Sequence, residues 1–264
     1  MKTVLLAALA LSASTALAQD PVRERLADSP RHHEWVEIAQ GGRTVHAFVA
    51  YPEAEGPVPA VIVIHENRGL NDWVRSVADR LAEAGYLAIA PDLLSGMGPN
   101  GGRTADFADS DAAREALYAL PPTQVTADLD AVADYVAGLA AADGTVTVAG
   151  FCWGGSQAFR FATDRPDLAA AFVFYGTAPD EPAAIARIAA PVYGFYGGDD
   201  ARVNATVPQT QVLAGEAGVT YESVTYDGAG HAFMRRGVTA EADDPNAVAR
   251  DAAWSRWLSL LETL

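Results

Sequence analysis

The chain has 264 residues, half of them hydrophobic, and its 18 Lys and Arg against 34 Asp and Glu give a formal net charge of −16. This apolar content excludes a disordered polymer, and the length suits one large domain or two small ones. The negative charge would repel a phosphate backbone or an anionic lipid surface, so we expect no nucleic-acid or membrane partner. A small molecule is the expected ligand.

The first 18 residues have the pattern of an export signal. Lys2 supplies a positive charge, residues 4–18 are apolar or small, and Ala16-Leu17-Ala18 has the small-x-small motif that a signal peptidase recognises. The apolar run is too short for a membrane-spanning helix. We therefore predict that residues 1–18 are a signal peptide. The mature protein, residues 19–264, is then exported to the periplasm or the medium and is free of the membrane after cleavage.

Beyond this segment, strand and helix patterns alternate along the chain. The predicted strands are Val45 to Tyr51, Ala60 to Ile64, Leu87 to Ala90, Thr145 to Ala149, Ala170 to Tyr175, Pro191 to Tyr196 and Val219 to Thr225. The predicted helices run from Asn71 or Asp72 to about Ala84, from Thr123 to Ala142, from Ser156 to Ala162 and from about Asn246 to Leu264, with a helical stretch before each of the last two strands. The alternation predicts one α/β domain with a mostly parallel central sheet and helices on both faces.

Residues that follow the strands carry the chemistry in such a sheet, because ligands bind at the carboxyl ends of parallel strands. The strand predicted at Thr145 to Ala149 is followed by Gly150-Phe151-Cys152-Trp153-Gly154. This G-x-C-x-G pattern is typical of a nucleophile elbow, a strained turn that lifts the central side chain above the sheet and needs flanking glycines. Cys152 is the only cysteine, so it cannot form a disulfide within the chain. The alternative is a buried, inert cysteine, and the spacing favours the nucleophile.

A thiol nucleophile requires a base, and the base requires an orienting carboxylate. In this class of fold the chain order is nucleophile, acid, histidine. Asp199 and Asp200 follow the strand that ends at Tyr196, and His231 follows the last predicted strand after a glycine-containing turn. The order therefore predicts a triad of Cys152, one of the two aspartates and His231.

Metal and cofactor sites are not expected. His32 and His33 are adjacent, so their side chains point apart, and no further ligands cluster near them. His46 lies in a predicted strand. Neither of the glycine-rich nucleotide-binding motifs, G-x-x-x-x-G-K-[ST] or G-x-G-x-x-G, follows a strand.

Four segments, in this order, make the sequence resemble the dienelactone hydrolases, a family with the α/β-hydrolase fold. They are His65 to Asn71, Gly150 to Gly155, Gly197 to Asp200 and Gly230 to Phe233, and the resemblance extends from about Pro57 to the end of the chain. It implies that Cys152 is the nucleophile and His231 the base. It also implies that Asp200, three residues before Val203, is the orienting acid rather than Asp199.

The resemblance assigns further roles around the thiol. Glu66 corresponds to the family's glutamate beside the resting thiol. From their placement at a helix start and after a strand, we expect the backbone N–H groups of Trp153 and Asn67 to form the oxyanion hole. The family's substrates include enol-lactones that bear a carboxylate, which arginines bind. Arg235 falls on one such position, and Arg103 lies in the long glycine-rich loop from Leu94 to Asp109, a length typical of functional loops.

The predicted function is hydrolysis of a small carboxylic ester or lactone through a thioester, by an enzyme that is expected to be monomeric and to need no cofactor. A secreted esterase or thioesterase of broad range, using the same triad on neutral substrates, is one alternative. A non-catalytic binding module on the same fold is another, and the complete triad disfavours it. The sequence departs from the family in its export signal and in Asn204, where the family usually has Pro.

Overall fold

A computed structural model describes residues 20–264, so the predicted signal peptide and its cleavage site lie outside the described residues. The strands are β1 (His33–Gln40), β2 (Arg43–Ala50), β3 (Val58–Ile64), β4 (Leu87–Asp92), β5 (Ala142–Phe151), β6 (Ala170–Phe174), β7 (Val192–Gly197) and β8 (Tyr221–Tyr226). The helices are α1 (Pro21–Asp28), α2 (Asp72–Glu83), α3 (Ser110–Tyr118), α4 (Pro122–Ala137), α5 (Trp153–Asp164), α6 (Pro182–Ile185), α7 (Ala201–Asn204), α8 (Val207–Ala217), α9 (Phe233–Arg236) and α10 (Pro245–Leu261). Two 3-10 turns, η1 (Pro99–Gly101) and η2 (Thr104–Asp106), lie in the long loop.

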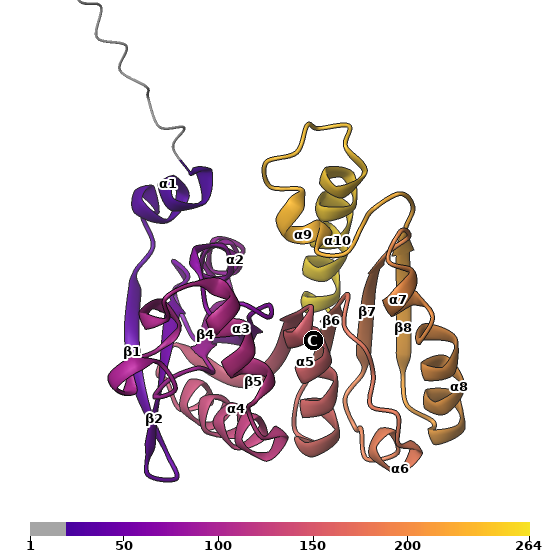
Figure 1. The fold of residues 1–264 in the computed structure, drawn as a ribbon, viewed down its shortest axis with the longest axis horizontal. Helices are drawn as coiled ribbons and strands as arrows, with labels where there is room; N and C mark the ends of the chain where they lie inside the picture. Colours follow the sequence, from indigo (N-terminus) through magenta and orange to yellow (C-terminus); the bar gives the residue numbers. More distant parts are fainter. Residues whose placement is uncertain (1–19) are drawn as a thin grey trace, which may run out of the picture.

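The eight strands form one sheet in the order β1-β2-β4-β3-β5-β6-β7-β8 (Figure 1). All pairs from β4 to β8 are parallel, whereas β2 pairs antiparallel with both β1 and β4. The carboxyl ends of the parallel strands therefore meet at one edge of the sheet. The predicted α/β architecture with a mostly parallel sheet is confirmed.

The apolar run of β3 shows why the sheet is covered on both faces. Its side chains alternate, so that Ile62 and Ile64 belong to one buried cluster and Val61 and Val63 to the other. Helices α3, α4, α5, α6 and α8 contribute buried side chains to the first cluster, and α2, α9 and α10 to the second. In residues 20–264, no helix is both long enough and apolar enough to span a membrane.

The predicted elements differ from the observed ones mainly at their ends. The helix predicted over residues 123–142 ends at Ala137, because Gly138 caps it and the chain turns into β5 at Ala142. Asn71, one of the two residues at which this helix was predicted to start, caps α2, and its side chain accepts a hydrogen bond from the Val74 N–H at 3.1 Å.

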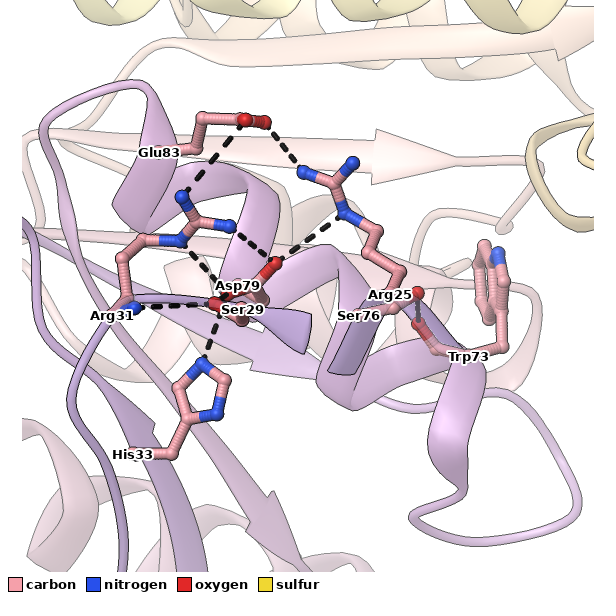
Figure 2. Close-up of polar contacts among 8 residues, drawn as sticks. All are labelled: Arg25, Ser29, Arg31, His33, Trp73, Ser76, Asp79 and Glu83. Atoms are coloured by element: carbon pink, nitrogen blue, oxygen red, sulfur yellow. Dashed lines mark hydrogen bonds and ion pairs between the residues drawn. The ribbon is translucent and has the colours of Figure 1, made fainter. Parts of the chain in front are cut away.

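Two elements near the amino end, α1 and β1, are additions to the predicted set. Strand β1 forms a hairpin with β2 through Gly41 and Gly42, both of which have positive φ. No residue of helix α1 is fully buried. Its Arg25 side chain forms an ion pair with the buried carboxylate of Asp79 on α2 (Figure 2).

The same carboxylate anchors the chain between α1 and β1. The Asp79 carboxylate accepts a hydrogen bond from Ser29 at 2.5 Å, and Arg31 donates to both carboxylate oxygens at 2.8 Å (Figure 2). A ring nitrogen of His33 lies 2.9 Å from one of these oxygens. We call Asp79, Arg25, Ser29, Arg31 and His33 the Asp79 cluster. It attaches the amino-terminal segment together with Val22 and Leu26 of α1, which pack against the second buried cluster.

Candidate active site

Cys152 stands at the junction of β5 and α5, and its backbone is strained. Its φ of 57° and ψ of −116° are unusual for a residue with a side chain, and its backbone N–H is fixed by the Phe174 carbonyl at 3.0 Å. This conformation raises the thiol over the carboxyl edge of the sheet.

Glycine is required on both sides of the elbow. A Cβ at Gly150 would lie 1.9 Å from the carbonyl oxygen of Gly154, and a Cβ at Gly154 would lie 2.4 Å from that of His65. Both obstacles are backbone atoms, which cannot rotate away. The close approach of β3, β5 and α5 therefore depends on the absence of these side chains.

His231 connects the thiol to a buried carboxylate. Its Nε2 lies 3.1 Å from Cys152 Sγ, and its Nδ1 lies 2.5 Å from Asp200 Oδ2. The Asp200 side chain is buried and also caps α7 through the Val203 N–H. Asp199, in contrast, is exposed. The structure thus brings Cys152, His231 and Asp200 into one hydrogen-bonded chain and leaves Asp199 outside it.

Glu66 lies at the end of β3, buried between a tyrosine and an arginine. Tyr175 donates its hydroxyl to one carboxylate oxygen at 3.3 Å, and Arg235 Nε lies 2.6 Å from the other. The ring of Tyr175 also meets that of His231 edge to face, with centroids 5.1 Å apart. The sequence pattern does not identify Tyr175 as a site residue. Its position directly after β6 could have done so, because ligands bind at the carboxyl ends of parallel strands.

The pKa of the Cys152 thiol is raised by burial and, next, by the negative charge of Glu66. Hydrogen bonds from the backbone N–H groups of Trp153 and Asn67 lower it in part. Both N–H groups expected to form an oxyanion hole thus act on the pKa of Cys152. A resting thiol follows, because burial and the charge of Glu66 outweigh these hydrogen bonds.

His65 is a second residue that the pattern leaves unassigned. It is fully buried, its Nδ1 lies 2.8 Å from the Glu66 carbonyl oxygen, and its ring stacks on that of Trp153 with centroids 5.7 Å apart. Burial lowers its pKa, which favours the neutral ring. His65 thereby joins the end of β3 to the start of α5, the two segments that supply Asn67 and Trp153.

The two arginines expected to bind substrate occupy different surroundings. Arg103 does not join the cluster around Cys152, because its guanidinium lies over the ring of Trp35, 4.1 Å from the centroid. Trp35 belongs to β1, a strand absent from the predicted set. Arg235 is near the thiol, but its charge faces Glu66.

A small pocket of about 170 Å³ opens above the thiol. Its lining residues are Tyr118, Cys152, Trp153, Ser156, Tyr175, Thr177, Arg202 and Val203. A larger cavity of about 680 Å³ lies between α1, α2 and α9 and is lined by Arg235 but not by Cys152. We take the smaller one as the candidate reaction site because it contains Cys152, the predicted nucleophile. In residues 20–264, no three His, Cys, Asp or Glu side chains are grouped so that they could hold a metal ion.

Comparisons with known proteins found similar sequences and similar structures. The model of the dienelactone hydrolase family matches residues 45–264. A "Putative carboxymethylenebutenolidase" of Escherichia coli K12 is 36% identical over 212 residues, covering 75% of this chain and 76% of the relative. A protein of the same name from Saccharolobus solfataricus is 31% identical, covering 83% and 94%. The crystal structure of a "Putative Dienelactone Hydrolase" from Klebsiella pneumoniae superposes with a TM-score of 0.78 at 30% identity, covering 89% of this chain and 99% of that one.

Proposed function

The chain belongs to the dienelactone hydrolase family and is a hydrolase of esters or lactones, and we propose that it works through a Cys152-His231-Asp200 triad and a thioester intermediate. The observation that carries this proposal is the unbroken chain of contacts from Asp200 through His231 to Cys152, at 2.5 and 3.1 Å, on a strained elbow. An inert cysteine would need neither the strain nor the imidazole.

In the first half of the proposed reaction, the thiol proton passes to His231 Nε2 as the sulfur attacks the substrate carbonyl. A carbon–sulfur bond forms, and the negative charge on the carbonyl oxygen is held by the N–H groups of Asn67 and Trp153. The carbon–oxygen bond to the leaving group then breaks, and His231 donates the proton to that oxygen. For a lactone, the leaving group stays attached as the far end of the opened ring.

Water completes the second half. His231 takes a proton from a water molecule, whose oxygen attacks the thioester carbonyl, and the carbon–sulfur bond breaks as the acid is formed. The proton returns to the sulfur. Asp200 holds the imidazole so that Nε2 faces the reacting groups in both halves.

Glu66 and Arg235 are proposed to set the resting state of the thiol. The carboxylate raises the pKa of Cys152, and Arg235 offsets part of that negative charge by its ion pair with Glu66. A neutral thiol is less exposed to oxidation than a thiolate. This property would suit an exported enzyme with a single cysteine.

A substrate panel tests the proposal. The mature protein, residues 19–264, should hydrolyse small esters and lactones, and Cys152→Ala should abolish turnover while the thermal midpoint stays near that of wild type. Including the anionic and the neutral form of each substrate separates a dienelactone-like preference from the broad-range esterase alternative. Turnover by Cys152→Ala at the wild-type rate would refute the triad.

Export is proposed on the sequence pattern of residues 1–18 alone. Amino-terminal sequencing of the protein recovered outside the cytoplasm should begin at Gln19. An intact Met1, or a protein confined to the cytoplasm, would refute cleavage and export.

A further inference from the structure

The turn that carries Asn67 is attached to the long loop by a threonine. This turn runs from Glu66 to Gly69, and the Gly69 N–H donates to the Glu66 carbonyl oxygen at 3.3 Å. The next N–H along the chain, that of Leu70, donates to the hydroxyl of Thr104 at 3.2 Å. Thr104 belongs to η2, so a residue 34 positions further along the chain holds the end of the turn.

The hydroxyl of Thr104 is itself fixed by a buried carboxylate. It donates to Asp92 Oδ1 at 2.6 Å, and the backbone N–H of Thr104 donates to Asp92 Oδ2 at 3.0 Å. Asp92 is the last residue of β4 and is 1% exposed, so the sheet sets its position. A hydroxyl has one proton, and donation of that proton to Asp92 leaves a lone pair of Thr104 for the Leu70 N–H. The carboxylate therefore orients the group that holds the turn.

The turn and η2 are packed closely against each other. Gly69 has a φ of 77°, and a Cβ there would lie 2.3 Å from Thr104 Oγ1. Glycine thus permits both the left-handed backbone and the close approach of the hydroxyl. The start of the turn has a separate support, because His65 Nδ1 lies 2.8 Å from the Glu66 carbonyl oxygen. Asn67 lies between these two attachments.

The position of Asn67 matters because its backbone N–H is one of the two donors expected in the oxyanion hole. The other donor, Trp153, begins α5 and is held by that helix, whereas Asn67 lies in a turn. The Asn67 N–H also lowers the pKa of Cys152, which indicates that it lies near the sulfur. A catalytic group that is misplaced by about 1 Å can cost about 10²-fold in rate. The contacts at the ends of the turn are therefore expected to affect catalysis.

We propose that Thr104 is a positioning residue for the oxyanion hole, and that its hydrogen bond to Leu70 holds the Asn67 N–H in place. This inference rests on the proposed function, because an oxyanion forms only when Cys152 attacks a carbonyl. It assigns a task to the long loop from Leu94 to Asp109, in which η2 brings the threonine hydroxyl to the turn. Reactions of Cys152 that form no oxyanion should not depend on Thr104.

Two reactions of the single cysteine separate these cases. Acylation by 4-nitrophenyl acetate passes through an oxyanion, whereas iodoacetamide reacts at a saturated carbon and forms none. Both reagents are uncharged, and a change in the pKa of Cys152 affects both rate constants, so it largely cancels from their ratio on the mature protein. In Thr104→Val the acylation-to-alkylation ratio should fall about tenfold, less than the 10²- to 10³-fold typical of a removed donor, because Asn67 is displaced but still present. The kcat for the ester should fall while its KM stays within about twofold.

Three further variants identify the cause. Thr104→Ser retains the hydroxyl and should keep the ratio within about threefold of wild type, whereas Thr104→Ala removes it without added bulk and should match Thr104→Val. Thr210→Val removes a buried hydroxyl on α8 that donates to the Thr206 carbonyl oxygen at 3.0 Å, and should leave the ratio within about twofold. An unchanged ratio in Thr104→Ala would overturn the proposal. So would equal slowing of both reactions, because Thr104 would then act on the thiolate or on the fold as a whole.

The variant Cys152→Ala separates this inference from the proposed function. If it hydrolyses 4-nitrophenyl acetate at the wild-type rate, the triad is wrong and the role of Thr104 falls with it. If it is inactive and the ratio in Thr104→Val equals that of wild type, the triad stands and only the role of Thr104 is refuted. An inactive Cys152→Ala together with a ratio lowered about tenfold in both Thr104→Val and Thr104→Ala supports the two proposals.

Discussion

The catalytic pocket and the Asp79 cluster both contain a buried carboxylate, yet the groups that pair with it differ. In the Asp79 cluster, both oxygens of one carboxylate are bonded, by Ser29, Arg31 and His33 (Figure 2). The hydrogen bonds outweigh the effect of burial and lower the pKa of Asp79 to about 2. Both carboxylate oxygens of Asp79 therefore have hydrogen-bond partners within the protein.

The catalytic pocket is paired less completely. Asp200 bonds a histidine that itself contacts a thiol, and the exposed residue Arg202 lines the same pocket as that thiol. The comparison teaches that buried charge alone does not mark a site of chemistry. A buried carboxylate with both oxygens bonded stabilises the fold, whereas groups that line an open pocket beside the strained Cys152 are accessible to a substrate. Variants in the first region should therefore change stability, and variants in the second should change rates.

The largest expected effect is in the catalytic pocket. Asp200→Asn should lower kcat about 10⁴-fold, because the imidazole loses the partner that orients it and stabilises its charged form. Asparagine still caps α7, so the thermal midpoint should change little. Steady-state kinetics with melting curves measure both quantities. Asp199→Asn is the matched control, and a greater loss of kcat in that variant would contradict the assignment of the acid.

The next effect is in the Asp79 cluster. Asp79→Ala should lower the free energy of unfolding by about 3–5 kcal/mol, because it leaves the largely buried Arg31 without its partner. The value of kcat at 25 °C should stay within about twofold. Urea denaturation measures the loss, with Glu83→Gln as the exposed control, expected below about 1 kcal/mol. A large loss of kcat with unchanged stability would reverse the comparison.

The pH dependence of stability provides a second measurement on Asp79. Its pKa is lower in the folded protein, so the stability it contributes is fully present above its unfolded pKa of 3.8. That stability is lost as the pH falls from about 4 to about 2, and amounts to about 2 kcal/mol. Asp79→Asn should remove this part of the acid dependence. An identical acid profile in the variant would show that other carboxylates control it.

The smallest expected effect concerns the charge beside the thiol. Glu66→Gln removes a negative charge that raises the pKa of Cys152 and releases Arg235, so both changes favour the thiolate. Iodoacetamide should therefore alkylate the variant about three- to tenfold faster at pH 7. Glu222→Gln, which removes an exposed carboxylate on β8, should leave the rate unchanged. Slower alkylation of Glu66→Gln would contradict the role given to this carboxylate.

The elbow and the parallel sheet were predictable because their signals are local. The Gly-x-Cys-x-Gly spacing lies within five residues, and the obstacle at Gly150 is the backbone of Gly154 in the same turn. The apolar run of β3 can likewise be identified without knowledge of its neighbours in the sheet. The chain order of acid and base adds the positions of Asp200 and His231. Each of these features can be recognised from the residues of its own segment or from the order of segments along the chain.

The remaining features depend on contacts between segments far apart in the sequence. Helix α1 is too polar to be identified by an apolar face, and it is attached through Asp79, about fifty residues away. Arg103 lies over Trp35 because β1 occupies the edge of the sheet, and no short pattern predicts that pairing. Arg202 looks like any surface arginine until α7 is placed against the thiol pocket.

The central claim, that Cys152 carries the acyl group during hydrolysis, is tested most directly by mass spectrometry of a trapped intermediate. His231→Gln, mixed with 4-nitrophenyl acetate, should react slowly through its thiol and then fail to deacylate, because it lacks the base that activates water. One acetyl group per chain should accumulate on the peptide containing Cys152, be released by hydroxylamine and be absent from the double variant with Cys152→Ala. An acetyl group on Ser156 or another residue, or equal labelling of the double variant, would contradict the account.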